Sequence, residues 1–238
     1  MKAGLLFLTI AVALTASAQN SAGQALVDKA RKLIVVTTPG WNSVDGTLTR
    51  YERSHKKWKQ VGEPVPIVVG KNGLAWDPSL EQGDAPVKHE GDGRSPAGIY
   101  PINETFGFAP SLGGSKHYLS LTPAVECVDD TNSSHYAHIV SNEQVSKDWN
   151  SSEHMRSIDA YRWGAIVPYN MSSTKPGAGS CIFLHVWSGP GKGTAGCTAM
   201  PEQTMSDMVR WIGSPGATVL VQMPASEYER LKQSLGTP

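Results

Sequence analysis

The segment FLHVWSGPGKGTAGCTAM, residues 183–200, shows a short apolar run followed by a glycine-rich turn, a pattern that recurs along the chain. With the two residues before it, the segment begins with the alternating run CIFLHVW. In an extended strand, this run places Ile182, Leu184 and Val186 on one face and Phe183, His185 and Trp187 on the other. A glycine-rich loop that carries Cys197 follows, so the segment predicts a strand and then a loop.

Short apolar runs separated by Gly, Pro and Asn-Gly turns recur on both sides of this segment. Strands are expected at 33–38, 46–53, 64–70, 97–102, 117–122, 136–141, 163–169 and 217–223. Helices are expected at 151–161, which has a serine N-cap, and at 201–213, which begins with proline and has one apolar face. The pattern predicts a mostly β fold, a β-sandwich or barrel of short strands with one or two short helices.

The N-terminus has the features of a secretory signal peptide. Lys2 precedes an apolar run from Leu5 to Leu14, and the small residues Ala16-Ser17-Ala18 form a cleavage site. The apolar run is too short to span a bilayer comfortably, so no stable membrane insertion is expected. We therefore expect a signal peptide at 1–18, an N-terminal extension at 19–32 and one catalytic domain at 33–238, in a periplasmic or extracellular protein.

Composition narrows the range of partners. The 238 residues include 21 Lys and Arg and 21 Asp and Glu, so the formal net charge is zero. No basic patch stands out, which argues against nucleic acid as a partner. Hydrophobic residues make up 39% of the chain, enough to form a sizeable core.

The three cysteines differ in their surroundings. Cys127 and Cys181 lie beside strand-like runs, where they are either buried thiols or the two halves of a disulfide. Cys197 lies in the glycine-rich loop, and an odd count leaves one thiol without an intramolecular partner. Cys197 is the odd one out under both readings.

His185 and Cys197 together suggest nucleophilic catalysis. Only the thiolate attacks, and an adjacent imidazole accepts its proton and forms an ion pair with it. Gly196 allows close approach of a substrate carbonyl, and main-chain N–H groups around Thr194, Ala195 and Gly196 are candidates to hold the oxyanion. This arrangement indicates acyl transfer through a thioester. The alternative is a core histidine beside a small buried cysteine.

HVWSGPGKGTAGCTAM resembles the active-site signature of the L,D-transpeptidases with a YkuD-type catalytic domain. In that signature a histidine, a variable loop, Ser or Thr, a residue that is often His and Gly-Cys follow in order. The resemblance makes His185 the base, Thr194 the hydroxyl residue and Gly196-Cys197 the nucleophile turn. KHEGDGRSPAGIYPI, at 88–102, resembles the family's G-D-x-x-T-P-x-G segment, and the likeness extends over roughly residues 65–223. The sequence departs from the family's pattern at Ala195, at Ala199 and in the short spacing between His185 and Cys197.

The resemblance implies an exported enzyme that acts on peptidoglycan stem peptides without a metal or organic cofactor. The expected donor bond joins the L-centre of a diamino acid to a terminal D-residue. The acceptor is an amine of another stem peptide, a free D-amino acid, a lipoprotein lysine or water. Arg94 is a candidate for binding a substrate carboxylate, or for a salt bridge with Asp92. Trp187 and Ser188 are candidates for lining the cleft, with Trp187 as a core residue the alternative.

Two other classes of function fit parts of the sequence. A zinc hydrolase, such as an L,D- or D,D-carboxypeptidase, would draw ligands from His135, His138, Asp129, Asp130 or His154. However, His-x-x-His on an alternating strand points the two rings to opposite faces, and no H-E-x-x-H motif is present. A non-catalytic cell-wall binding protein is the second alternative, and the reactivity of the Cys197 thiol discriminates between the classes.

Overall fold

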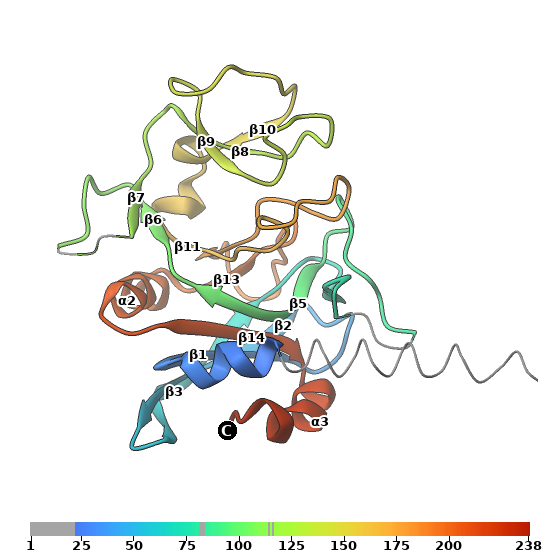
Figure 1. Cartoon of the computed structure of the whole chain (residues 1–238), viewed down its shortest axis with the longest axis vertical. Helices are drawn as coiled ribbons and strands as arrows, with labels where there is room; N and C mark the ends of the chain where they lie inside the picture. Colours follow the sequence, from blue (N-terminus) through green and yellow to red (C-terminus); the bar gives the residue numbers. More distant parts are fainter. Residues whose placement is uncertain (1–21, 81–83, 114, 116) are drawn as a thin grey trace, which may run out of the picture.

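The computed structural model describes residues 22–80, 84–113, 115 and 117–238, and it shows a mostly β protein (Figure 1). The expected signal peptide at 1–18 lies outside the described residues. Most strands join one mixed sheet of eleven strands, in the order β4-β5-β14-β1-β2-β3-β13-β12-β11-β6-β7. A second sheet of three strands, in the order β10-β8-β9, lies at one end of the molecule (Figure 1).

The strands of the large sheet are short except at its centre. They are β1 (Lys32–Thr38), β2 (Asp45–Ser54), β3 (Lys57–Val68), β4 (Leu74–Trp76), β5 (Ser95–Ile102), β6 (Thr105–Gly107), β7 (Tyr118–Ser120), β11 (Trp163–Ile166), β12 (Phe183–Val186), β13 (Thr198–Met200) and β14 (Thr218–Pro224). The small sheet contains β8 (Val125–Val128), β9 (Ile139–Ser141) and β10 (Ser152–His154). Two 3-10 turns, η1 (Met155–Ser157) and η2 (Asp159–Arg162), connect the small sheet to β11.

The helices cover the large sheet. One helix occupies residues 22–29, and the others are α2 (Glu202–Gly213) and α3 (Ala225–Leu235). Helix α2 buries Met205, Met208, Val209 and Ile212, so its apolar face supplies part of the main core. No helix among the described residues combines the length and the apolar character needed to cross a membrane.

Strand β12 is buried on both faces, and each face belongs to a different core. Ile182, Leu184 and Val186 pack into the main core with β1, β14 and α2. Phe183, on the opposite face, belongs to a second core that includes Phe106, Met155 and Tyr161. The alternation expected for 181–187 is therefore confirmed, and it places His185 on the face toward the second core.

The strand expectations hold at every predicted run, because a strand overlaps each of them. The helix expected at 201–213 is confirmed as α2. The helix expected at 151–161 is wrong, because Ser152–His154 instead pairs antiparallel with β8 and residues 155–162 form 3-10 turns. Backbone pairing with a neighbouring strand outweighed the local helix signals there. Helix α3 was not anticipated from its mostly polar sequence.

Candidate active site

Strands β12 and β13 bring His185 and Cys197 to one pocket. The two strands are parallel, with His185 opposite Ala199, and Cys197 directly precedes β13. Ordinary strand dimensions then separate the two Cα atoms by about 8 Å, a gap that an imidazole side chain can largely span. Both residues line the same pocket of about 350 Å³.

His185 is held in one tautomer by the main chain. Its Nδ1 lies 2.8 Å from the carbonyl oxygen of Val186, and a carbonyl only accepts hydrogen bonds, so Nδ1 carries the proton. In the neutral ring, Nε2 is then the nitrogen with a free lone pair, ready to accept a proton. The ring is buried and contacts the Tyr161 ring edge-on, with 5.3 Å between the ring centroids.

Cys197 is buried, and its sulfur contacts the backbone at the start of β12. The Phe183 N–H donates to Sγ at 3.3 Å, and the thiol donates to the Cys181 carbonyl oxygen at 3.4 Å. Burial raises the pKa of the Cys197 thiol well above its usual range and lowers that of the His185 imidazole. The resting site therefore holds a neutral thiol and a neutral imidazole, not the ion pair expected from the sequence.

The turn that carries Cys197 is attached to two distant segments of the chain. The Cys197 carbonyl oxygen accepts hydrogen bonds from Ser95 Oγ at 2.8 Å and from Thr194 Oγ1 at 2.5 Å. Ser95 Oγ in turn accepts the Gly70 N–H, also at 2.8 Å. A Cβ on Gly193 would lie 2.5 Å from the Lys71 backbone, so only glycine permits the loop to pack this closely.

These bonds revise the expected oxyanion donors. The Thr194 N–H donates to the Val69 carbonyl oxygen, and the Gly196 N–H donates to Thr194 Oγ1. Neither group is therefore available to a substrate as the site stands. Within the described part of the chain, the N–H groups of Ala195 and Cys197 have no hydrogen-bond partner, so they are the remaining candidates.

Comparison with protein families gives a match over most of the chain. Residues 26–221 match the family model YkuD, the L,D-transpeptidase catalytic domain. The chain belongs to this family. Comparisons with curated proteins and with solved structures found no match. The YkuD domain is that of an L,D-transpeptidase-type enzyme, and enzymes of this family act on peptidoglycan.

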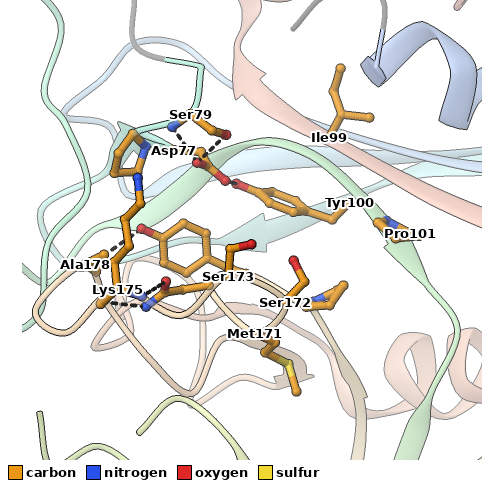
Figure 2. A pocket seen from close by; sticks show the side chains of 14 residues that line it. Asp77, Ser79, Ile99, Tyr100, Pro101, Met171, Ser172, Ser173, Lys175 and Ala178 are labelled. Atoms are coloured by element: carbon orange, nitrogen blue, oxygen red, sulfur yellow. Dashed lines mark hydrogen bonds between the residues drawn. The ribbon is translucent and has the colours of Figure 1, made fainter.

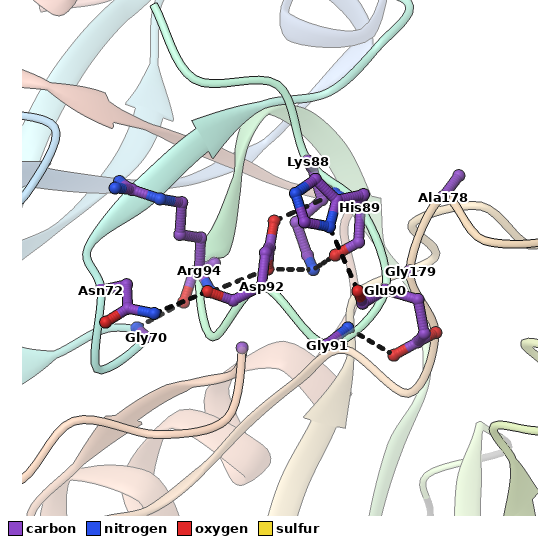
Figure 3. A network of polar contacts seen from close by, with 12 residues as sticks. Gly70, Asn72, Lys88, His89, Glu90, Gly91, Asp92, Arg94, Ala178 and Gly179 are labelled. Carbon is purple, nitrogen blue, oxygen red and sulfur yellow. Dashed lines mark hydrogen bonds and ion pairs between the residues drawn. The ribbon is translucent and has the colours of Figure 1, made fainter.

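Arg94 has a structural role in this YkuD domain, contrary to the expectation that it binds a substrate carboxylate. Its guanidinium donates to the carbonyl oxygens of Trp41 and Leu74 and to Asn42 Oδ1 at 2.8–3.0 Å. Figure 3 shows the side chain extended away from the loop that holds Lys88 and Glu90. These bonds engage both hydrogens of Nη1 and one of Nη2, and Arg94 is not among the residues that line the pocket.

Trp187 and Ser188 also lie outside the pocket lining. Trp187 follows β12, is half-buried, and donates its N–H to the Met200 carbonyl oxygen. Ser188 is exposed. Their expected place in the cleft stays a prediction, with no support from the lining of this pocket.

Charged residues that the sequence did not indicate as catalytic also line the YkuD pocket: Lys71, Lys88, Glu90 and Glu153. Asp129, a candidate ligand of the zinc alternative, lines it as well. Lys88 is buried and forms an ion pair with Asp92 at 2.7 Å (Figure 3). Glu153 was assigned to the first turn of a helix that does not exist. Tyr161, which also lines the pocket, carried no signal in the sequence beyond its apolar neighbours.

Cys127 and Cys181 form a disulfide in the structure, and Cys197 is the free cysteine. The bridge ties β8 of the small sheet to the segment just before β12. The Cys197 thiol donates a hydrogen bond to the main-chain carbonyl oxygen of Cys181, so the disulfide lies directly beside Cys197.

A larger pocket, of about 590 Å³, lies on another part of the domain (Figure 2). Its lining includes Asp77, Tyr100, Tyr169 and Lys175 but no cysteine or histidine. Tyr100 donates to Asp77 there at 3.2 Å. His185 and Cys197 both line the smaller pocket.

The residues of the zinc alternative do not converge. His138 has both ring nitrogens bonded to carbonyl oxygens, of Tyr136 and Met171, while His154 faces Glu126. In the chain as described, no group of three His, Cys, Asp or Glu residues gathers closely enough to hold a metal ion. The zinc reading lacks a ligand set.

Proposed function

We propose that this protein is an exported peptidoglycan L,D-transpeptidase in which Cys197 is the nucleophile and His185 the base and acid. The observation that carries the proposal is the hydrogen bond from His185 Nδ1 to the Val186 carbonyl oxygen. It leaves Nε2 unprotonated in a ring that shares one small pocket with the only free cysteine among the described residues.

Acylation begins from the neutral pair. As Sγ attacks the carbonyl carbon of the donor amide, the thiol proton passes to His185 Nε2. The oxyanion forms beside the N–H groups of Ala195 and Cys197. Collapse of the tetrahedral intermediate breaks the C–N bond, and the leaving amine of the terminal D-residue takes the proton from Nε2. The product is a thioester on Cys197 with a neutral imidazole.

Deacylation repeats these steps with a new nucleophile. An acceptor amine attacks the thioester carbon and gives a proton to His185 Nε2. The C–S bond then breaks, and the sulfur regains a proton from the imidazolium. With water in place of the amine, the same steps give hydrolysis, which is carboxypeptidase activity. The substrate in this proposal is a stem peptide that contains a diamino acid, and the place of action is the periplasm or the extracellular space.

The test is incubation of purified protein with defined muropeptides, followed by mass spectrometry of the products. The expected products are cross-linked dimers or D-residue exchange, with loss of the terminal residue alone if water is the acceptor. Cys197→Ala is expected to abolish all of these. Ser234→Ala, on the exposed face of α3, is the matched control and is expected to leave turnover unchanged.

A carbapenem provides a second readout, because β-lactams of that class acylate this family. Intact-mass spectra are expected to show one adduct on the wild type and none on Cys197→Ala. Undiminished turnover by Cys197→Ala, or an adduct on another residue, would contradict the assignment of the nucleophile.

A further inference from the structure

Tyr161 lies between the base and the nucleophile without a role in the mechanism above. It belongs to η2, and its ring is clamped by three edge-on contacts, with Phe106 at 5.8 Å, Phe183 at 5.3 Å and His185 at 5.3 Å between centroids. Tyr161 belongs to the same cluster of buried side chains as Cys197 and lines the same pocket, and its hydroxyl is close enough to the Cys197 sulfur for each group to shift the pKa of the other. A ring clamped on several sides keeps its hydroxyl in one place.

The Tyr161 hydroxyl has a second partner in Glu153. It lies 2.6 Å from Glu153 Oε2, and Glu153 also lines the pocket. Glu153 is held in place by β10, where it pairs with Cys127 of β8. A carboxyl, a phenol and a thiol therefore form a row along one wall of the pocket.

The row matters because the thiolate has few stabilising contacts. Burial and the nearby Glu153 carboxylate disfavour charge on the sulfur, and the Phe183 N–H and Tyr161 hydroxyl favour it. The phenol has a single proton, so it can donate to the carboxylate or to the sulfur, but not to both. Which of them receives the proton depends on whether Glu153 is ionised.

We propose that Tyr161 is a further catalytic residue, which donates a hydrogen bond to the Cys197 sulfur when the sulfur is anionic, and that Glu153 is the positioning residue that directs this hydrogen bond. The proposal rests on the proposed function only in taking Cys197 as the nucleophile.

The Glu153–Tyr161 pair has two hydrogen-bonding states, one with Glu153 protonated and one with Glu153 ionised. When Glu153 is protonated, its O–H donates to the Tyr161 oxygen, and the phenol proton is free to point at the thiolate. When Glu153 is ionised, the phenol donates to the carboxylate and the sulfur keeps its own proton, directed to the Cys181 carbonyl oxygen. The two states differ by the one proton that Glu153 exchanges with solvent; the thiol proton passes to His185 Nε2 and not to this pair.

Glu153 changes between these two states near neutral pH. Burial raises the pKa of Glu153 and nearby acids add to this, while the bond from Tyr161 opposes it, and the pKa is about 7. The charged and titratable groups that face Glu153 across the pocket are Lys71, Lys88, Glu90, Asp129, Tyr161, His185 and Cys197. Of these, Asp129 and Glu90 raise its pKa by repelling its carboxylate.

The test is the rate of Cys197 alkylation by iodoacetamide, measured from about pH 5 to about pH 9. For the wild type, we expect the rise of rate with pH to flatten near pH 7, where Glu153 ionises. Below about pH 7, where Glu153 is protonated, Tyr161→Phe is expected to slow alkylation roughly 10- to 100-fold, since it removes a hydrogen bond to a charged group. Glu153→Gln is expected to remove the flattening and to react faster than the wild type above about pH 7.

Tyr136→Phe is the matched control. Tyr136 is another buried tyrosine whose hydroxyl bonds a pocket glutamate, Glu90, at 2.5 Å. Its loss is expected to lower stability but to leave the shape of the alkylation profile unchanged. A merely structural role for Tyr161 predicts that Tyr161→Phe alkylates at the wild-type rate at every pH. Glu153→Gln would differ from the wild type even then, because the Glu153 carboxylate itself disfavours charge on the sulfur.

Wild-type alkylation rates in Tyr161→Phe, or a persistent flattening in Glu153→Gln, would overturn the proposal. If Tyr161→Phe fails to fold, as circular dichroism would reveal, protein labelled with 3-fluorotyrosine, whose phenol is a stronger hydrogen-bond donor, takes its place: faster alkylation below about pH 7 supports the proposal, and an unchanged rate overturns it. Alkylation needs no muropeptide, so a protein that alkylates as expected but turns over no muropeptide refutes the proposed function and leaves this inference standing.

Discussion

Removal of the Cys127–Cys181 disulfide should cost the protein a large part of its stability. The two cysteines are 54 residues apart, and the bridge closes that length of chain in the unfolded state. The chain-entropy model assigns a cross-link of this length about 4 kcal/mol at 25 °C. A domain with ordinary stability of about 5–15 kcal/mol would remain folded but with a much lower margin.

The assay is urea unfolding of the double variant, Cys127→Ala with Cys181→Ala, against oxidised wild type. We expect a lower midpoint and a steeper dependence on urea, because the unfolded chain without the bridge exposes more surface. Cys197→Ala is the control, since it keeps the bridge and removes only the free thiol. Turnover should also fall in the double variant, because the disulfide holds the Cys181 carbonyl oxygen that accepts a hydrogen bond from the Cys197 thiol.

Two results would refute this reasoning. One is an unfolding free energy for the double variant within about 1 kcal/mol of the oxidised wild type, far below the entropy expected for this loop. The other is three titratable thiols per chain in denatured protein that was folded under oxidising conditions. The expected number is one, from Cys197.

Three further changes test other parts of the site. Ser95→Ala should lower the unfolding free energy by about 1–3 kcal/mol, since it leaves the buried Gly70 N–H without a partner; thermal melts check this, and an unchanged melt would contradict it. His185→Gln should reduce muropeptide turnover roughly 10²–10⁴-fold, as for loss of a general base, and unchanged turnover would refute its role. Burial acts to raise the pKa of Glu126, but hydrogen bonds from three neighbouring side chains lower it to about 2. The folded pKa lies below the unfolded value, so Glu126 stabilises the fold above about pH 4.5 and this contribution disappears as the pH falls toward 2. Unfolding free energies of Glu126→Gln should show a weaker loss over that range, and a loss equal to that of the wild type would count against it.

Local pattern was sufficient to predict α2 and the strands at the expected runs, because alternation and an apolar helical face can be read from neighbouring residues. Strands such as β4, β6 and β10 were not predicted. The segment at 151–161 shows where local pattern fails. Its serine and early glutamate favour a helix start, but Ser152 donates to Glu126 on β8 at 2.5 Å and the segment becomes an edge strand. A partner 26 residues away decides its structure.

The candidate site, like the fold, was predictable from the sequence only in part. His185 and Cys197 are 12 positions apart on adjoining strands, so one motif reveals both. Tyr161 and Glu153 reach the pocket from η2 and β10, which the sequence did not indicate. Arg94 was expected to bind substrate because a charged side chain next to a family motif is often a ligand contact. In the structure its guanidinium donates to carbonyl oxygens from two other segments of the chain.

The burial of Cys197 has a consequence for how the protein acquires its correct covalent form. Three cysteines allow three different single bridges, and two of those would consume Cys197. Thiol–disulfide exchange requires a thiolate, and in the folded chain burial raises the pKa of the Cys197 thiol well above its usual range. Once the domain has folded around the Cys127–Cys181 bridge, Cys197 is therefore a poor attacker of that bridge and of other disulfides. The environment that keeps the thiol unreactive at rest also preserves the one pairing compatible with activity.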